Sequence, residues 1–290
     1  MSVTLRSSVL ALGLLAIAAT IARAQAPPAS GNASPPAASA AQEPDDPDTD
    51  VNLAQPDFRL ATLATNLRLP RHKMVFSLTH RFGRPLAAGS FGNLAGDLFG
   101  LDSGAQVGLD FRYGLIKGGQ VGIYRTSNRT IQFYGQYEVT SQKSFPLGIS
   151  VTASVDGTDN FSDSYSPGVS LVVSRELSNR AAVYLEPAFI NNTNPVPSSL
   201  ASHNDTAMVG LGARLRVLAS TYLVLEASPR VAGYAPGDML VSFGIERRAG
   251  GHLFQLNFSD GFGTTLAQVA RGGTSTSDWY IGFNLSRKFY

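Results

Sequence analysis

The chain lacks cysteine, long apolar stretches and any strong excess of one charge. With no cysteine, disulfides, thiol catalysis and thiolate metal sites are excluded, and the composition suits a compartment in which stray thiols would oxidise. After the N-terminus, no stretch approaches the ~18 uninterrupted apolar residues of a membrane-spanning helix. The formal net charge of +2 argues against a nucleic-acid-binding protein, whose basic residues would cluster.

The N-terminus has the pattern of a secretory signal peptide. Arg6 supplies a basic start, residues 9–19 form a short apolar run, and Ala22-Arg23-Ala24 follows the small-x-small rule for cleavage. The alternative is an N-terminal membrane anchor, but the run is roughly half of the ~20 apolar residues that a spanning helix needs. We therefore expect residues 1–24 to be a signal peptide that is cleaved after Ala24, so that the protein is exported.

Residues 25–66 are predicted to be a disordered lead-in rich in alanine, proline and aspartate. Residues 27–50 hold almost no large apolar side chain and end in an acidic run, so they cannot bury enough surface to become ordered. Asp45, Asp46, Asp48 and Asp50 invite comparison with a calcium loop, but such a loop needs a geometry-setting glycine, and Pro47 interrupts the run. A solvated periplasmic linker is the preferred interpretation.

From residue 67 to residue 290, apolar and polar residues alternate along the chain. In residues 105–113, for example, Val107, Leu109 and Phe111 share one face, while Asp110 and Arg112 lie on the other. About twelve such segments occur, each close to the ~9–11 residues that a tilted membrane strand requires. They lie near residues 74–82, 105–113, 120–125, 131–139, 147–155, 169–176, 181–189, 207–217, 221–228, 239–247, 252–258 and 279–286. This pattern predicts an all-β, antiparallel, up-and-down transmembrane β-barrel.

Alternation alone does not decide which face meets water. A secreted sandwich or a soluble barrel would turn its apolar face inward. Three features favour the membrane barrel: the polar faces lack the lysine and glutamate coat of a soluble exterior, about twelve strands enclose too wide a space for a simple apolar core, and aromatic residues fall near strand ends. These aromatic residues are Phe82, Tyr113, Tyr137, Phe189, Trp279 and Phe289.

Short turns that alternate with long loops, at residues 84–103, 156–166, 191–205 and 259–277, also fit a barrel in an outer membrane. The chain stops at Phe289-Tyr290, a variant of the aromatic end that barrel-assembly machinery reads on a C-terminal strand. We therefore expect outer-membrane lipid and this machinery to be partners.

Several stretches resemble an uncharacterised family of bacterial outer-membrane β-barrel proteins, a domain of unknown function. The most distinctive are residues 251–258, GHLFQLNF, and 281–287, IGFNLSR; shorter matches include residues 79–83, THRFG, and 100–104, GLDSG. The resemblance runs from about residue 66 to the end. It implies a barrel and an outer-membrane location, and it implies no activity.

His80 and His252 each lie in one of these motifs, and their role is open. His252 together with Ser259 and Asp260 could suggest a hydrolase. However, no Gly-x-Ser-x-Gly elbow is present, and no close spacing of histidine and acidic residues supports a metal site. We predict no catalytic residue, no metal and no cofactor, because no phosphate-loop or GxGxxG motif joins a strand to a helix. The two histidines are better explained as ties between strand ends or as part of an interfacial belt.

Charged residues on the polar faces are candidates for the lining of the lumen. They could form a mutually paired network, since unpaired charges away from water are costly, or rings that set the selectivity of a water-filled pore. If Arg214 and Arg216 lay unpaired at a constriction, they would favour anionic solutes. The candidates are Asp110, Arg112, Glu138, Arg214, Arg216, Glu226 and Glu246.

Three functions remain open from the sequence. The preferred one is a pore or uptake barrel for small solutes. The alternatives are a closed barrel with a structural or partner-binding role and, less favoured, a membrane-embedded hydrolase. A barrel fold by itself cannot choose among them.

Overall fold

A computed structural model describes residues 52–194, 204–275 and 277–289. These residues belong to one unit, Asp45–Tyr290. The expected signal peptide, the first part of the expected lead-in and Tyr290 lie outside the described residues.

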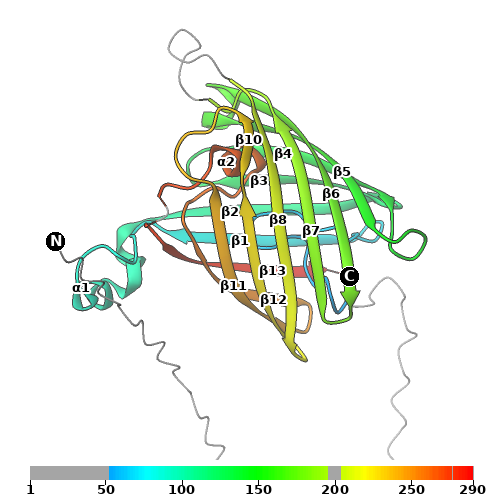
Figure 1. Cartoon of the computed structure of the whole chain (residues 1–290), viewed down its shortest axis with the longest axis horizontal. Helices are drawn as coiled ribbons and strands as arrows, with labels where there is room; N and C mark the ends of the chain where they lie inside the picture. The colour runs from blue at the N-terminus through cyan, green and yellow to red at the C-terminus, as the bar shows by residue number, and fades with distance from the viewer. Residues whose placement is uncertain (1–51, 195–203, 276, 290) are drawn as a thin grey trace, which may run out of the picture. The chain divides into compact units, whose positions relative to one another are not determined.

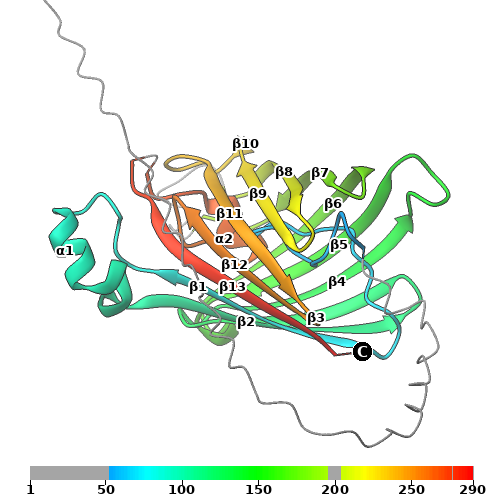
Figure 2. The ribbon, with the colours of Figure 1, turned by 90° about the horizontal axis from the view of Figure 1, so that it is seen from below.

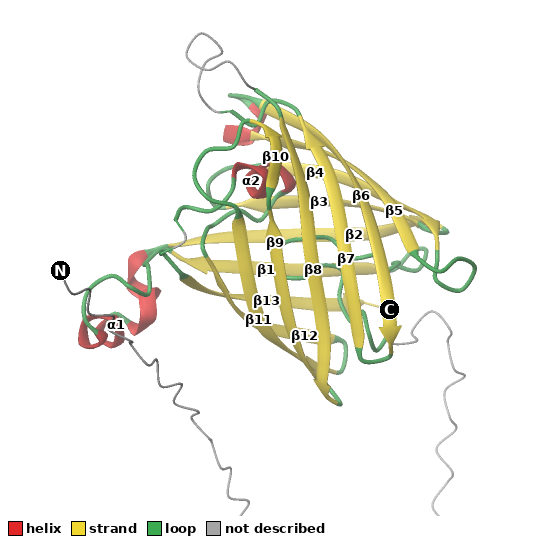
Figure 3. Cartoon of the chain, in the orientation of Figure 1, coloured by secondary structure: helices red, strands yellow, loops and turns green. Residues whose placement is uncertain are grey.

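The described chain is mostly antiparallel β-structure (Figures 1 and 3). Every one of the segments expected to be a strand is a strand, which confirms the all-β prediction. The strands are β1 (Met74–Phe82), β2 (Ala105–Ile116), β3 (Gly119–Thr126), β4 (Ile131–Thr140), β5 (Gly148–Gly157), β6 (Tyr165–Ser178), β7 (Ala181–Ile190), β8 (Thr206–Leu218), β9 (Thr221–Ser228), β10 (Arg230–Gly233), β11 (Leu240–Ala249), β12 (His252–Ser259) and β13 (Tyr280–Phe289).

The sheet closes on itself. From β1 to β9 each strand pairs with the next, β9 pairs with β11, β11 with β12, β12 with β13, and β13 with β1, so these twelve strands close a ring (Figure 2). β9 and β10 lie along the same side of β8 and are separated by Pro229, which has no N–H to donate to the ladder. They count as two halves of one strand, and the ring is therefore a closed, up-and-down barrel of twelve strands.

The apolar face of the barrel points outward. Phe111, Phe133 and Ile245 are each close to half exposed, whereas Gln132 and Gln136 on the alternate face are buried in the lumen. A soluble barrel with a packed apolar centre would show the reverse. Because the strands pair around a closed ring, this polarity suits a barrel surrounded by hydrocarbon.

The two ends of the barrel differ as an outer-membrane barrel requires. At one end, four of the five connections are tight turns of two residues or so, and both β1 and β13 reach this end. The other end carries longer loops with short helices: α1 (Phe91–Gly96), the 3₁₀ segments η1 (Leu98–Ser103) and η2 (Thr158–Phe161), and α2 (Leu266–Arg271). None of the helices in the described part of the chain has the length and apolar character to cross a membrane.

The predicted aromatic residues divide between the two ends. Tyr113, Tyr137 and Phe289 lie near the short turns, and the exposed fraction of each is between 39% and 52%. Phe82, Phe189 and Trp279 lie near the long loops, where the Trp279 ring contacts Phe243 at a centroid distance of 5.3 Å. Two such belts are what the headgroup regions on either side of a hydrocarbon layer favour.

The predicted disordered lead-in is wrong for residues 52–66, which lie inside the barrel. Ala54, Phe58, Leu60 and Leu63 are among the most buried side chains of the protein. The physical reason is that the composition of this segment differs from that of the alanine- and proline-rich stretch before it. Apolar residues recur every few positions and are buried in apolar clusters. The remainder of the expected lead-in, residues 25–51, lies outside the described residues.

Candidate functional site in the barrel lumen

Residues 52–69 form a hairpin inside the lumen, which we call the N-terminal hairpin. Arg59 and Ala64 form an antiparallel bridge, and the N–H of Leu60 donates to the carbonyl of Leu63 at 2.8 Å, which closes the tip. The hairpin leads into β1, so it enters from the short-turn end. At that mouth, the side chains of Asn52 and Gln55 both donate to Glu176 at 2.6 Å.

Glu226 on β9 holds the tip of the hairpin. Its carboxylate accepts the backbone N–H groups of Ala61, Thr62 and Leu63 at 2.9–3.1 Å, and it also accepts the Thr62 hydroxyl at 2.5 Å. The carboxylate and the tip are both buried. Hydrogen bonds to a charged acceptor are among the stronger ones in proteins, so Glu226 satisfies the polar backbone of a turn that would otherwise lie unpaired in the lumen.

Arg59 of the hairpin pairs with Asp110 on β2. The guanidinium Nη2 lies 3.2 Å from Asp110 Oδ2, and Nε donates to the same oxygen at 3.2 Å. Burial by itself would lower the pKa of Arg59, but the Asp110 carboxylate raises it above the usual value, so the guanidinium stays charged. Arg112, also on β2, lies over the ring of Phe58 at 5.0 Å and donates to Gln136 at 3.2 Å.

Arg214 on β8 and Glu246 on β11 form a buried pair within the wall. Arg214 Nε lies 2.8 Å from Glu246 Oε2, and Nη2 lies 2.9 Å from Oε1, so the contact is bidentate. Arg214 also donates to the backbone carbonyls of Asp57 and Arg59. Arg214 therefore connects the barrel wall to the hairpin.

The other lumen candidates lie near the short-turn end. Glu138 and Arg216 are partly exposed, and Arg216 donates to the carbonyl of Ala219 at 2.8 and 3.0 Å. Because Arg214 is paired with Glu246, the arrangement in which Arg214 and Arg216 are both unpaired at a constriction is not present. Asp110, Arg214 and Glu246 are paired, as the network interpretation expects. Asp110 pairs with Arg59 of the hairpin, whereas Arg214 and Glu246 pair with each other.

A second segment enters the lumen from the long-loop end. The loop between β12 and β13 turns inward and carries α2, whose residues Ala267, Val269 and Ala270 are buried. Asp156 on β5 accepts the Thr265 hydroxyl and the backbone N–H of Ala267 at the start of this helix. Part of the long loop that the sequence predicts at residues 259–277 thus lies inside the barrel lumen.

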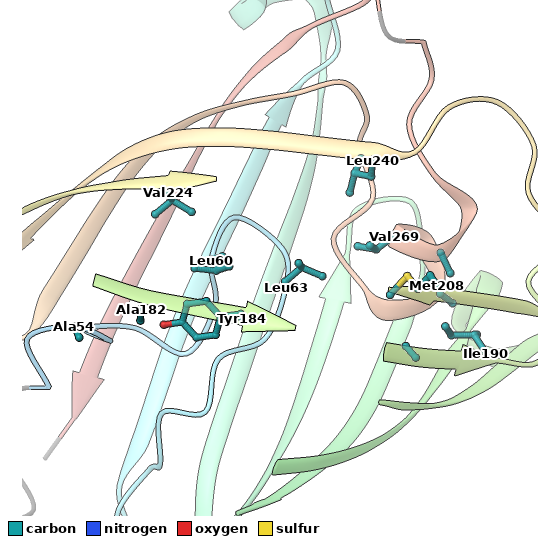
Figure 4. Close-up of a cluster of buried hydrophobic side chains, with 13 residues drawn as sticks. Ala54, Leu60, Leu63, Ala182, Tyr184, Ile190, Met208, Val224, Leu240 and Val269 are labelled. Carbon is teal, nitrogen blue, oxygen red and sulfur yellow. The ribbon is translucent and has the colours of Figure 1, made fainter. Parts of the chain in front are cut away.

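The hairpin and α2 meet in an apolar cluster. Figure 4 shows Leu60 near Tyr184 and Val224, with Leu63 on the side towards Val269 of α2. The wall makes room for this contact: a Cβ added to Gly212 would lie 2.2 Å from Leu60 Cδ1. The wall is therefore shaped to accept the hairpin closely.

A small cavity lies in the lumen beside the hairpin. A cavity of about 40 Å³ lies between the hairpin and the wall formed by β4–β7. Its lining includes Arg59, Gln132, Thr152, Ser154 and Glu186. Because one water needs roughly 10–15 Å³ in this measure, this cavity has room for only a few water molecules.

The two motif histidines both lie on the outer face. His80 stacks on Phe283 of β13 at a centroid distance of 4.9 Å, and His252 lies 2.5 Å from Arg287 through Nε2. His252 and Ser259 are at opposite ends of β12, roughly 23 Å apart at about 3.3 Å per residue. The structure therefore does not bring together the His252, Ser259 and Asp260 set. Among the described residues, no group of three or more histidine, aspartate or glutamate side chains is arranged to hold a metal ion.

Sequence reasoning found Asp110, Arg214 and Glu226 as candidates but missed several other residues that attach the two inserts to the wall. Arg59 lay in the segment expected to be disordered, and Asp156 was expected at the start of a loop. Arg81 was not among the candidates, although it is fully buried and donates to Asn284 at 2.9 Å and to the carbonyl of Ala61. The available signal was the lone arginine among apolar residues at 58–63, which is unusual for a solvated linker.

Comparison with known proteins agrees with this architecture. The model of the family described as membrane bound beta barrel domain (DUF5777) matches residues 57–289, which include the tip of the hairpin. The comparison with curated proteins found no match.

Among solved structures, a NanC porin is similar with a TM-score of 0.52 at 8% identity, over 75% of this chain and 100% of that chain. A KdgM porin matches with a TM-score of 0.48 at 7% identity, over 75% and 99%. A porin from Rhodopseudomonas blastica matches with a TM-score of 0.34 at 13% identity, over 63% and 55%. At these identities the likeness to the NanC porin concerns the fold alone. Together with the match to the family model, which spans most of the sequence, the closed barrel leads to one conclusion: this chain belongs to the family of membrane bound beta barrel domains.

Proposed function

We propose that the protein is a gated pore for small solutes in an outer membrane, closed in the described state by the N-terminal hairpin. One observation carries this proposal: polar groups of the wall are bonded to a segment that is not part of the wall. Glu226, Asp110 and Arg214 all bind hairpin atoms. A barrel that was permanently closed could satisfy its lumen with side chains of the wall itself.

Water can replace these contacts when the hairpin leaves. The net contribution of an ordinary hydrogen bond to stability is only about 0.5–1.5 kcal/mol, because water offers the same partners. Wall residues such as Gln132, Gln136 and Ser170 are also polar, so an emptied lumen would be wettable. Removal of the hairpin therefore leaves a polar channel rather than a collapsed apolar core.

The second candidate is a closed barrel with a structural or partner-binding role. The observation in its favour is the apolar contact between α2 and the wall, in which Val269 and Ala270 are almost fully buried. If α2 stays in place, it alone could block the lumen after the hairpin leaves. The two candidates therefore differ in what a barrel without the hairpin would conduct.

The outer-membrane location and export through a cleaved signal peptide belong to this proposal. Support comes from the outward apolar face, the two aromatic belts and the position of Phe289, which is exposed at the end of β13. We propose in addition that the barrel-assembly machinery reads this last strand, and that the protein has no enzymatic role. A lipid-hydrolysis assay with His252→Ala as the control would oppose the last point if the wild-type protein alone were active.

The decisive experiment removes residues 52–66 and measures conductance in planar lipid bilayers. We expect the full-length protein to be silent or to open only briefly, and the deletion variant to give stable conductance steps. The matched control removes residues 87–96, a loop segment outside the lumen. Heat-modifiable migration on gels verifies that each barrel is folded. A folded deletion variant without conductance would contradict the gated pore and favour the closed barrel.

A further inference from the structure

The guanidinium of Arg59 occupies a pocket that the barrel wall builds around a carboxylate. Besides its two contacts with Asp110, Arg59 Nη1 donates to the carbonyls of Thr62 and Thr264 at 3.4 Å. The guanidinium carbon lies 4.8 Å from the ring centroid of Tyr124 and 5.7 Å from that of Tyr134. A carboxylate with two aromatic rings is the arrangement that proteins use to bind organic cations.

The wall holds this pocket in place without help from the hairpin. The Tyr134 hydroxyl donates to Asp110 Oδ1 at 2.7 Å, and the Tyr124 and Thr79 hydroxyls are 2.5 Å apart. The Tyr134 ring lies over Gly122, where an added Cβ would be 2.2 Å from the ring. All of these residues belong to β1–β4. The pocket is therefore preformed, and Arg59 is its present occupant.

A neighbouring cation already belongs to the wall. Arg112 Nη2 lies 3.9 Å from Asp110 Oδ2, and its guanidinium carbon is 5.0 Å from the Tyr134 ring centroid. The site thus tolerates a second guanidinium in the presence of Arg112. When Arg59 leaves, Asp110 keeps the Tyr134 hydroxyl and this longer contact with a cation, and a buried carboxylate gains from a closer cationic partner.

The cavity of about 40 Å³ opens beside the same guanidinium. Glu186 also lines it, and its carboxylate accepts the Ser170 hydroxyl at 2.8 Å and the backbone N–H of Ala64 at 3.1 Å. A second carboxylate therefore faces the space next to Arg59. Thr152 and Ser154 complete a polar surface along which the remainder of a small solute can lie.

We propose that the pocket formed by Asp110, Tyr124 and Tyr134 binds an alkylguanidinium solute, and that Arg59 of the N-terminal hairpin imitates this ligand in the closed state. The inference rests on the proposed function, because a solute can reach the pocket only when the hairpin moves. In this arrangement the solute and Arg59 compete for one carboxylate. Binding of the solute then favours release of the hairpin.

The test uses full-length Arg59→Ala protein in detergent micelles and equilibrium dialysis with agmatine as the probe. We expect saturable binding that is at least about tenfold tighter than in an Arg59→Ala/Asp110→Asn double variant, since the pocket loses its charge partner there. Methylguanidine should compete with agmatine, whereas methylurea, a neutral molecule of similar shape, should not. Folded Arg59→Ala protein that shows no saturable binding, or that binds as well without the Asp110 charge, would overturn the proposal.

A second measurement leaves Arg59 in place and remains informative if Arg59→Ala does not fold. Because the chain has no cysteine, Ala64→Cys provides a unique thiol on the hairpin. We expect agmatine to accelerate maleimide labelling of this thiol severalfold and methylurea to leave the rate unchanged; equal rates with both compounds would overturn the competition. Neither readout depends on conductance. The ligand proposal can therefore fail while the gated pore is supported, and the gated pore can fail while the ligand proposal is supported.

Discussion

The two segments that fill the lumen share one apolar cluster but differ in their charged contacts and in their covalent attachment. Leu60 and Leu63 of the N-terminal hairpin and Val269 and Ala270 of α2 all belong to this cluster. Several wall carboxylates contact the hairpin, among them Glu226 at its tip and Asp110 at Arg59, whereas Asp156 contacts the start of α2. Both lie within the barrel, yet only α2 is covalently held at each end by a strand of the wall, β12 and β13.

This difference indicates which segment can move. Release of the hairpin would exchange its charged and polar contacts for water but would also expose Phe58, Leu60 and Leu63, so the covalent attachment, and not the type of contact, distinguishes the two segments. The described hairpin is joined to the wall at one end, through β1, and its contacts with the wall are concentrated on a few side chains. We therefore interpret the hairpin as the gate and α2 as a fixed constriction.

The largest expected effect comes from Arg214, because this residue supports both the wall and the hairpin. Arg214→Ala leaves Glu246 buried without its partner, which should lower the free energy of unfolding by about 3–5 kcal/mol. Urea-induced unfolding in lipid vesicles measures this change. The control is Arg214→Met/Glu246→Met, in which neither charge of the pair is left; equal loss in both variants would mean that the unpaired charge of Glu246 is not the cause of the loss.

The next effect should show which contacts hold the N-terminal hairpin in the lumen. Glu226→Ala removes the acceptor of three backbone N–H groups, and we expect it to destabilise hairpin docking by about 3 kcal/mol, which is roughly a 100-fold rise in exposure of the hairpin. Labelling of Ala64→Cys reports this exposure. Glu176→Ala, which loses two contacts at the partly exposed mouth, is the matched control and should have a smaller effect. Similar rates in both variants would show that the tip is not the main attachment.

The apolar insert should respond to lost volume rather than lost charge. Val269→Ala removes buried methyl groups and should cost about 2 kcal/mol, measured again by urea-induced unfolding. We expect this loss to be the same at low and high salt, because the substitution removes no charge. A salt-dependent Val269→Ala loss would remove the distinction between the two segments.

The smallest effect is expected outside the lumen. Arg129 Nε lies 2.8 Å from Asp159 Oδ1 in the loops, the same distance as the Arg214 pair, but both side chains are largely exposed. Arg129→Ala should change the free energy of unfolding by less than about 0.5 kcal/mol. A loss comparable to that of Arg214→Ala would mean that burial is not what gives the lumen pair its importance.

The sequence alone determined the wall of this protein. Period-two alternation located every strand except the short β10, and the absence of a lysine- and glutamate-rich face, with aromatic residues near the strand ends, gave the correct outward direction of the apolar face. The alternation also predicted that Asp110, Arg112, Arg214, Glu226 and Glu246 lie on the face opposite to the apolar residues, and all five are buried, because in a strand the direction of each side chain follows from its position.

Only the tertiary structure decided what fills the wall. No local pattern showed that residues 52–66 would fold back into the barrel or that α2 would enter from the opposite end, because neither segment is ordered by its own sequence. Each becomes ordered through wall residues that are distant along the chain, such as Glu226 for Thr62 and Asp156 for Ala267. Strand direction is a local property of the backbone, whereas pairing between a wall charge and an insert exists only after the ring has closed.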